Sequence, residues 1–298
     1  MATTKNTMPD TLEARYNEVC DRIAAAAERS RRRASDIILC AVTKTADPEQ
    51  IKGLLRLGHR DFAENRVQQL IQHAAIVEEF LNRQKIVPSG KKLAPNISDT
   101  LFAAGGGGGK RVELKPVASL PGAHAGVRWH MIGHLQRNKA KKVTEFVRLI
   151  HSVDSLRIAE ELQHIALRKD HVIEVLIQVN CSGEGHKHGC PLPAAIPLAE
   201  QIQSMINVRV RGLMTMAPYS ENPEDSRPTF ARCRELFEEM STMGFGEESP
   251  FNILSMGMSG DYEVAISEGA NIVRVGTAIF GEAKTGPEQV ELPEAEEE

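Results

Sequence analysis

A lysine follows the first apolar run of the sequence, in Ala41-Val42-Thr43-Lys44. The run from Ile37 to Val42 predicts a strand, so Lys44 stands where the chain leaves a sheet. Desolvation at such a place disfavours the ammonium and makes the amine a better nucleophile toward an aldehyde. From its position alone, Lys44 is better interpreted as a solvated lysine in a loop. The alternative, that Lys44 is a nucleophile, needs support from other residues.

Glycine and hydroxyl residues gather after two later strand candidates. Phe251 to Ser255 runs into the segment 255–261, and Ile272 to Val275 continues as Gly276-Thr277. Small residues before a helix let backbone N–H groups bind an anion, and phosphate sites of α/β barrels frequently use the loops after strands 7 and 8. Neither cluster is a dinucleotide or ATP motif. Two ordinary turns are the alternative, but an amine and a phosphate cradle on one face suggest a phosphorylated aldehyde.

The segments around these residues resemble a known family. Six of them carry the resemblance, in this order: Ala41-Val42-Thr43-Lys44, Phe62 to Gln68, Trp129 to Lys139, Arg211 to Met214, Leu254 to Ser259 and Val273 to Gly281. They are similar to those of the pyridoxal phosphate homeostasis protein family, also called the proline synthetase co-transcribed homologue family. That family carries pyridoxal 5′-phosphate (PLP) in an alanine-racemase-like barrel. The resemblance runs from about residue 11 to 283, except for residues 83–126. This segment is longer than the segment that the family has at the same place in the chain.

The resemblance implies a role for each matching residue. Lys44 would hold PLP as a Schiff base. Ser259, the backbone N–H groups of Gly276 and Thr277, and the Thr277 hydroxyl would hold the phosphate. Arg274 would face the pyridine nitrogen and keep it unprotonated, which makes the ring a weaker electron sink than one paired with a carboxylate. The residues implied near the ring substituents are Asn65 and His130, and their implied neighbours are Ser255 and Met256.

Eight short β-branched or apolar runs predict the strands that must position these residues. They are Ile37 to Val42, His59 to Ala63, Val127 to Ile132, Leu149 to Val153, Glu174 to Asn180, Val208 to Met214, Phe251 to Ser255 and Ile272 to Val275. Helical patterns lie between most of them, and a further amphipathic helix from Leu12 precedes the first. This alternation predicts an α/β protein with a parallel sheet, and a single (β/α)8 TIM barrel is the economical closure. A doubly wound open sheet is the structural alternative.

Three segments fall outside the predicted barrel of residues 11–283. Residues 1–10 predict a flexible leader, residues 83–126 a glycine-rich surface insertion, and residues 284–298 an acidic disordered tail. About 229 residues remain, which is the size of one barrel. The formal net charge of −4 is concentrated in the tail, so the body is nearly neutral and offers no wide basic surface for nucleic acid.

The cysteine pattern indicates a reducing compartment. The five cysteines are scattered without a C-x-x-C pair, so a disulfide framework is not expected. No apolar run approaches the roughly 20 residues that span a bilayer, and residues 1–10 lack the apolar region of a signal peptide. We expect a cytoplasmic monomer with PLP and apo-PLP enzymes as partners, and no nucleic acid or membrane.

Four sequence patterns that could suggest a function also have structural interpretations. His130 and His134 have metal-like spacing, but the residues between them end a strand, so no metal site is expected. Lys187 matches a lysine of the family and could lie near the mouth of the site, or in an exposed loop. The basic run from Arg29 to Arg33 closes a helix, where cations complement the dipole. Three methionines are interpreted as core filling: Met205, Met214 and Met216.

Two classes of function remain open. A carrier would buffer or deliver PLP without turning over a substrate. A racemase needs a base on each face of the α-carbon, and Lys44 can serve only one. In the alanine racemases that share this barrel, the other base is a tyrosine from a second domain, and only about 20 residues follow the last strand here. Tyr219 is the one tyrosine worth testing, and the carrier is favoured. A Schiff-base aldolase acting on a sugar phosphate is a third, weaker alternative.

Overall fold

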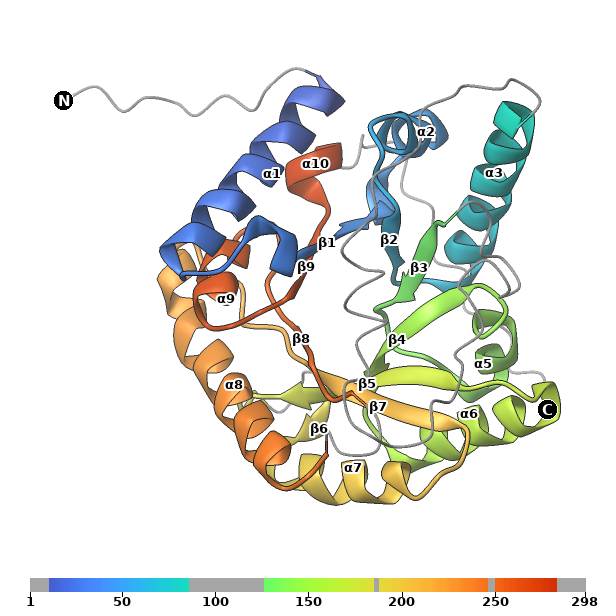
Figure 1. Cartoon of the computed structure of the whole chain (residues 1–298), viewed down its shortest axis with the longest axis vertical. Helices are drawn as coiled ribbons and strands as arrows, with labels where there is room; N and C mark the ends of the chain where they lie inside the picture. Colours follow the sequence, from blue (N-terminus) through green and yellow to red (C-terminus); the bar gives the residue numbers. More distant parts are fainter. Residues whose placement is uncertain (1–10, 86–125, 185–187, 246–249, 283–298) are drawn as a thin grey trace.

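Eight parallel strands close into a barrel in the computed structural model, which describes residues 11–85, 126–184, 188–245 and 250–282 (Figure 1). The strand order around the barrel is β4, β3, β2, β1, β9, β8, β7, β5, and pairing of β4 with β5 closes it. The eight strands are β1 (Ile38–Val42), β2 (Asp61–Glu64), β3 (Arg128–Met131), β4 (Val147–Val153), β5 (Ile173–Asn180), β7 (Val208–Met214), β8 (Ile253–Ser255) and β9 (Ile272–Val275). The predicted (β/α)8 barrel is confirmed, and the open sheet is excluded.

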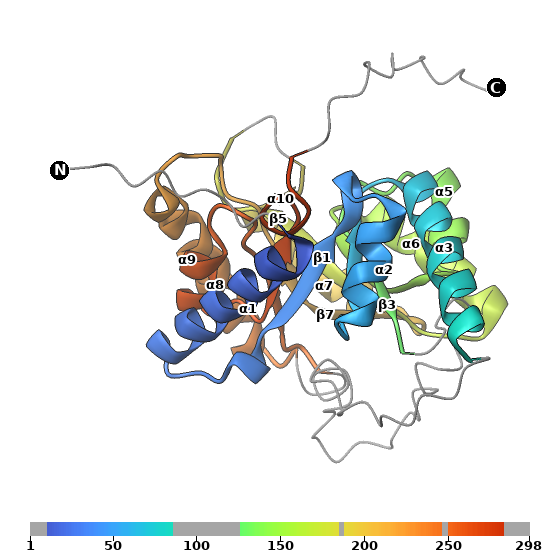
Figure 2. The same cartoon turned by 90° about the horizontal axis from the view of Figure 1, so that it is seen from above.

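Helices surround the barrel as an outer layer, as both views show (Figures 1 and 2). They are α1 (Leu12–Arg29), α2 (Pro48–Arg56), α3 (Val67–Lys85), α5 (Arg137–Val143), α6 (Leu156–Lys169), α7 (Ala195–Gln203), α8 (Arg227–Thr242), α9 (Tyr262–Ser267) and α10 (Thr277–Phe280). The extra N-terminal helix α1 packs against α9 and α10. Thr11 caps its start by accepting a hydrogen bond from the backbone of Ala14.

The start of α2 links the outer layer to the C-terminal end of β1. Asp47 and Gln50 form a capping box, in which each side chain accepts a hydrogen bond from the other's backbone N–H at 2.8 and 2.9 Å. Gln50 Nε2 then donates to Phe280 O at 3.0 Å. This contact fixes α10 beside the end of β1, where Lys44 leaves the barrel.

The barrel interior is filled by side chains rather than by solvent. One apolar cluster lies inside, and a larger one lies between the strands and the helices. The buried members of the inner cluster are Ile38, Cys40, Ala63, Leu149, Leu176, Met214, Ile253 and Ile272. The interior also holds buried polar groups from β2, β3, β4, β8 and β9, which lead to the site.

Close packing of β7 against β8 depends on one glycine. Gly212 has a φ of +148°, and a Cβ placed there would lie 1.8 Å from Ile253 O. No side chain fits this space, and L-residues rarely adopt this backbone conformation. The glycine therefore sets the register that brings the ends of both strands to the cavity.

Some short described elements were not predicted from the sequence. The two-residue strand β6 (Cys190–Pro191) pairs with the end of β5, and the short helix α10 follows β9. Both are too short to show a periodic pattern. All five cysteines are free in the structure.

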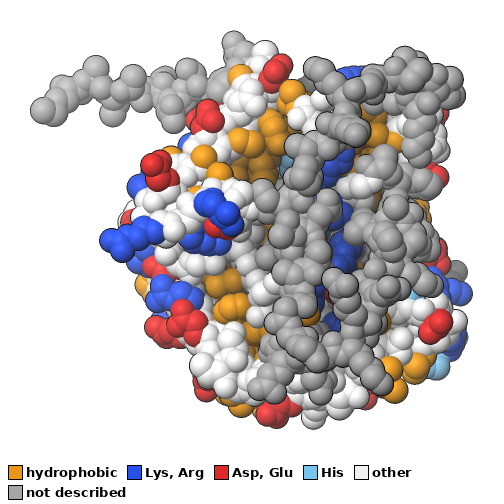
Figure 3. Space-filling model, in the orientation of Figure 1, with side chains coloured by type: hydrophobic (Ala, Val, Ile, Leu, Met, Phe, Trp, Pro, Cys, Tyr) orange, Lys and Arg blue, Asp and Glu red, His pale blue; other side chains and the backbone are white. Residues whose placement is uncertain are grey.

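The basic run at the end of α1 makes intramolecular contacts. Arg29 pairs with Glu263 at 2.8 Å, Arg33 pairs with Asp36 at 2.9 Å, and Arg32 donates to Ala270 O at 2.7 Å. Figure 3 shows acidic and basic side chains interspersed along this edge of the molecule. Within the described segments, no helix combines the length and apolar character needed to cross a membrane.

Candidate functional site

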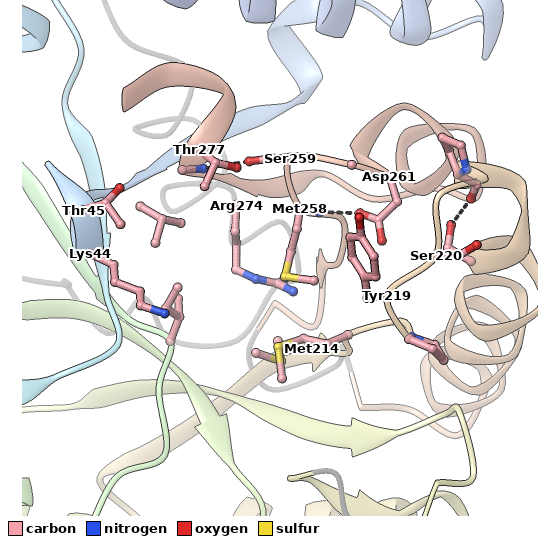
Figure 4. A pocket seen from close by; sticks show the side chains of 18 of the residues that line it. Lys44, Thr45, Met214, Tyr219, Ser220, Met258, Ser259, Asp261, Arg274 and Thr277 are labelled. Atoms are coloured by element: carbon pink, nitrogen blue, oxygen red, sulfur yellow. Dashed lines mark hydrogen bonds between the residues drawn. The ribbon is translucent and has the colours of Figure 1, made fainter. Parts of the chain in front are cut away.

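A cavity of about 340 Å³ opens at the C-terminal ends of β1, β7, β8 and β9 (Figure 4). We call it the strand-end cavity. Five of the residues predicted for the site line it: Lys44, Ser259, Arg274, Gly276 and Thr277. They come from three separate strand ends, so the closed barrel brings together residues more than 200 positions apart in the sequence.

The backbone turn that carries Lys44 is held by buried polar contacts. Thr43, the preceding residue, donates from Oγ1 to Ala63 O at 3.3 Å and to Glu64 Oε1. Glu64 is fully buried, and its Oε1 lies 2.7 Å from His73 Nδ1. These contacts join the end of β1 to the end of β2 and fix the place from which Lys44 projects.

The Lys44 side chain points into the cavity from the side opposite Tyr219 (Figure 4). It is exposed, and no described residue forms a hydrogen bond or ion pair with its Nζ. The strand end therefore leaves this side chain solvated rather than desolvated. The amine is accessible to a molecule entering the cavity.

An anion cradle forms where β8 and β9 end. Ser259 Oγ accepts hydrogen bonds from the backbone N–H groups of Gly276, at 3.2 Å, and Ala278, at 3.3 Å. A Cβ at Gly276 would lie 3.2 Å from Val42 O, which is tighter than most real contacts. Thr277 adds an exposed hydroxyl on the same rim. Hydroxyl and backbone N–H groups converging at a helix start are suited to a phosphate.

Arg274 places a buried cation against the cavity. Its side chain is 2% exposed, and it donates from Nη1 to Ser255 Oγ at 2.6 Å and from Nη2 to Thr215 O at 2.9 Å. Burial lowers the pKa of Arg274 to about 10, so the guanidinium is still charged at neutral pH. No described carboxylate forms an ion pair with it, so a ligand atom with a lone pair can meet its remaining donors.

Three of the eight predicted site residues do not line the strand-end cavity: Asn65, His130 and Ser255. Ser255 is fully buried directly behind Arg274, to which it is hydrogen bonded. His130 is fully buried inside the barrel, between Asp61 and His151. Neither side chain therefore touches the cavity directly, and both are connected to it only through hydrogen bonds with other side chains. Met256, implied as a neighbour, is also fully buried and outside the lining.

Asn65 follows β2 and is held by a close approach of the chain after β3. A Cβ at Gly133 would lie 2.0 Å from Asn65 O, so only glycine fits there. The Asn65 Oδ1 atom is buried and has no hydrogen-bond partner among the described residues. A buried amide oxygen in this condition needs a donor, which a ligand or water can supply.

Apart from Tyr219, the residues of the cavity wall opposite Lys44 were not assigned to the site from the sequence. Met214 belongs to the inner apolar cluster and Met216 packs against it, as the interpretation as core filling expected, and both also line the cavity. Met214 ends β7 and Met216 follows it, so their position at a strand end was the available signal. Tyr219 and Asp261 also line this side; Tyr219 is 93% exposed, and burial raises the pKa of Asp261.

The histidines noted for metal-like spacing lie apart. His130 is inside the barrel, whereas His134 is half exposed, 3.8 Å from Asp154, and stacked on His188 with ring centroids 5.1 Å apart. In the portion of the chain that the structure describes, no group of three or more His, Cys, Asp or Glu side chains is arranged to hold a metal ion. Lys187 lies outside the described residues.

Sequence comparison relates this barrel to a known class of proteins. Residues 20–284 match the family model of the alanine racemase N-terminal domain. The pyridoxal phosphate homeostasis protein of Aquifex aeolicus is 37% identical over 274 residues, which cover 91% of this chain and 97% of that protein. The chain therefore belongs to the pyridoxal phosphate homeostasis protein family.

Solved structures agree with this assignment. The structure of PipY from Synechococcus elongatus with PLP bound is similar with a TM-score of 0.62 and 28% identity, covering 88% of this chain and 100% of that one. An alanine racemase from Clostridium difficile is similar with a TM-score of 0.55 and 14% identity, covering 93% of this chain and 57% of that one. The second likeness is one of fold alone.

Proposed function

We propose that this protein binds PLP in the strand-end cavity and acts in intracellular PLP homeostasis, by buffering the cofactor or delivering it. The observation that carries the proposal is the convergence of an accessible lysine amine, a buried arginine and a hydroxyl and N–H cradle on one cavity. An aldehyde, a pyridine nitrogen and a phosphate are the groups that these three features suit. The family and the PLP-bound relative support the same ligand.

Each cavity residue has a proposed role toward the cofactor. Lys44 holds PLP as a Schiff base through Nζ. Ser259, the N–H groups of Gly276 and Thr277, and the Thr277 hydroxyl hold the phosphate. Arg274 donates to the pyridine nitrogen and keeps it unprotonated, because its guanidinium remains charged. When PLP is bound in this way, its aldehyde is held as an imine of the lysine amine. Its ring is then a weak electron sink, because the pyridine nitrogen is unprotonated.

The three predicted residues outside the lining keep proposed supporting roles. Asn65 accepts a hydrogen bond from a ring substituent of the cofactor through Oδ1, which is buried and has no hydrogen-bond partner among the described residues. Ser255 and His130 act from behind Arg274. Ser255 and His130 require no direct access to the cavity to influence how the cofactor is held.

We also propose the cellular setting. Apo forms of PLP-dependent enzymes are the recipients, and the protein works in the cytoplasm as a monomer. Five free cysteines support a reducing compartment. The closed barrel leaves no described barrel strand with an open edge for a second copy to extend, which supports the monomer.

Absorption spectra test the proposal. With PLP, the wild-type protein should develop the band at about 420 nm typical of a lysine–PLP imine. Lys44→Ala should lack this band, whereas Lys52→Ala should keep it, because Lys52 lies on α2 and pairs with Glu49. Absence of the band in the wild type, or its persistence in Lys44→Ala, would overturn the assignment.

Amino-acid racemisation is the second candidate function. One observation favours it, since Tyr219 lines the cavity on the side away from Lys44 (Figure 4). Incubation of the PLP-loaded protein with a broad amino-acid panel in D₂O measures α-proton exchange. A carrier should give no rate above that of free PLP, and clear exchange with any one amino acid would support the enzyme instead.

A further inference from the structure

Five buried side chains form a continuous hydrogen-bonded series through the barrel interior and end at the cavity. Asp61 Oδ1 lies 3.4 Å from His130 Nε2, and His130 Nδ1 lies 2.9 Å from His151 Nε2. His151 Nδ1 lies 3.0 Å from Ser255 Oγ, which accepts a hydrogen bond from Arg274 Nη1 at 2.6 Å. We call this series the histidine bridge. Every member is at most 4% exposed.

The histidine bridge crosses the barrel interior at one step, and its other steps join neighbouring strands. Its members lie on β2, β3, β4, β8 and β9. The step from His151 to Ser255 joins β4 to β8, which are not neighbours in the sheet. At the far end, Asp61 also accepts two hydrogen bonds from Arg128, at 2.7 and 2.8 Å, which hold the carboxylate in place.

The carboxylate decides the direction of the hydrogen bonds. A neutral histidine has one donor nitrogen and one acceptor nitrogen. If His130 donates from Nε2 to Asp61, its Nδ1 accepts from His151 Nε2–H. His151 Nδ1 then accepts the Ser255 hydroxyl hydrogen, and Ser255 Oγ accepts from Arg274. All four contacts are satisfied with both imidazoles neutral.

The opposite direction is unfavourable at both ends. It would place a lone pair of His130 Nε2 against the Asp61 carboxylate. It would also aim two donors, from His151 and Arg274, at Ser255 Oγ. The Ser255 hydroxyl hydrogen would then need another acceptor inside a buried site, where an unmade hydrogen bond is unfavourable.

We propose that Asp61, His130, His151 and Ser255 are positioning residues that hold Arg274 as a fixed hydrogen-bond donor to the ligand in the strand-end cavity. The identity of that ligand as PLP rests on the function proposed above. Arg274 has five N–H donors, and the bridge and Thr215 O engage one each from Nη1 and Nη2. The guanidinium plane is therefore set before the ligand arrives, and the donors left over face a ligand with little loss of side-chain freedom.

The electrostatics of the interior agree with neutral imidazoles. Burial lowers the pKa of His151 well below its ordinary value, and the neighbouring His130 and Arg274 lower it further. Burial also lowers the pKa of His130, although Asp61 opposes this. For Asp61, burial alone would raise the pKa, but hydrogen bonds from Arg128 and His130 outweigh it and hold the pKa below its ordinary value.

Histidine NMR tests the direction of the bridge without any PLP. Long-range ¹H–¹⁵N correlation at pH 7 distinguishes the two neutral tautomers from the charged imidazolium, with His→Gln variants to assign the signals. We expect both His130 and His151 as neutral Nε2–H tautomers. We also expect Ser255→Ala to shift the His151 nitrogen signals while those of His73, bound to Glu64 outside the bridge, stay in place. An Nδ1–H tautomer or a charged ring at either position would overturn the proposal.

Ligand binding by three variants tests whether the bridge acts on Arg274. Ser255→Ala removes the acceptor next to Arg274, and His151→Leu removes the link behind it. Each should weaken PLP binding by about 10- to 150-fold, the range for a hydrogen bond to a charged group. His151→Gln carries a donor and an acceptor in its amide and should recover part of this loss. The matched control is His59→Leu, since His59 is equally buried but bonds to Tyr16 and the Asp61 backbone.

The outcomes separate this proposal from the proposed function. PLP affinity unchanged in both Ser255→Ala and His151→Leu, or lowered equally in His59→Leu, would refute the bridge while leaving PLP binding intact. Failure of the wild type to bind PLP would refute the proposed function, and the tautomers would still decide the direction of the bridge. A ¹⁵N signal of ring-labelled PLP that matches the unprotonated pyridine in the wild type and changes in Ser255→Ala would support both.

Discussion

Ser259→Ala should weaken the binding of PLP but not that of pyridoxal, which lacks the phosphate. Ser259 Oγ is within 3.3 Å of the backbone nitrogens of Gly276 and Ala278, so its hydroxyl belongs to the anion cradle. A hydrogen bond to a charged group contributes about 1.5–3 kcal/mol, which corresponds to an increase of about 10- to 150-fold in the Kd for PLP. Pyridoxal carries no phosphate for the cradle to bind and should show less than about a twofold change.

Titrations of the wild type and Ser259→Ala with both ligands form a double-difference cycle. Absorption at about 420 nm reports formation of the lysine imine with either aldehyde. Ser267→Ala is the control, because Ser267 Oγ donates to Val264 O within α9 and does not line the cavity. An equal loss for PLP and pyridoxal in Ser259→Ala would show that the residue does not read the phosphate. An unchanged Kd for PLP would refute the cradle at this position.

Three further predictions concern stability, packing and chemistry. Burial lowers the pKa of His59 to about 4, below an unfolded value of about 6.5, so the stability that neutral His59 contributes is present above pH 6.5 and is lost as the pH falls toward 4. Urea unfolding of the wild type should therefore lose about 2 kcal/mol more between pH 7 and pH 5 than that of His59→Leu, and parallel losses would contradict the shift. Gly212→Ala should destabilise the fold by about 3 kcal/mol or more in the same assay, because its Cβ would overlap Ile253 O, whereas Gly58→Ala, at a φ of +92° with open space, should cost only about 1 kcal/mol. Tyr219→Phe should leave the rate of α-proton exchange in D₂O unchanged, and a fall in that rate would identify the phenol as a base.

The barrel and the core of its site could be predicted because both depend on local sequence. Strands of a parallel barrel are short apolar runs, and β9 occupies the predicted residues Ile272 to Val275. Residues such as Lys44, Ser259 and Thr277 directly follow strands, and the C-terminal ends of barrel strands meet on one face. The sequence therefore indicates that these residues share a face before any contact is known.

The histidine bridge could not be predicted because its contacts depend on how strands meet across the interior. His151 and Ser255 are separated by 104 positions and lie on strands that are not adjacent. A register shift between β3 and β4 also decides which residues of these strands face each other. His130 was assigned toward the cofactor from family resemblance, and only the three-dimensional structure shows that Asp61 and His151 surround it.

The covalent link to Lys44 is the central claim and is most directly measured by trapping it. Borohydride reduction of the PLP-loaded protein converts an imine into a stable secondary amine, and mass spectrometry of the proteolytic peptides locates the modified residue. We expect one phosphopyridoxyl group, on the peptide that contains Lys44, and none on that peptide in protein reduced without PLP. Modification at another lysine with Lys44 left unmodified would contradict the assignment of the site.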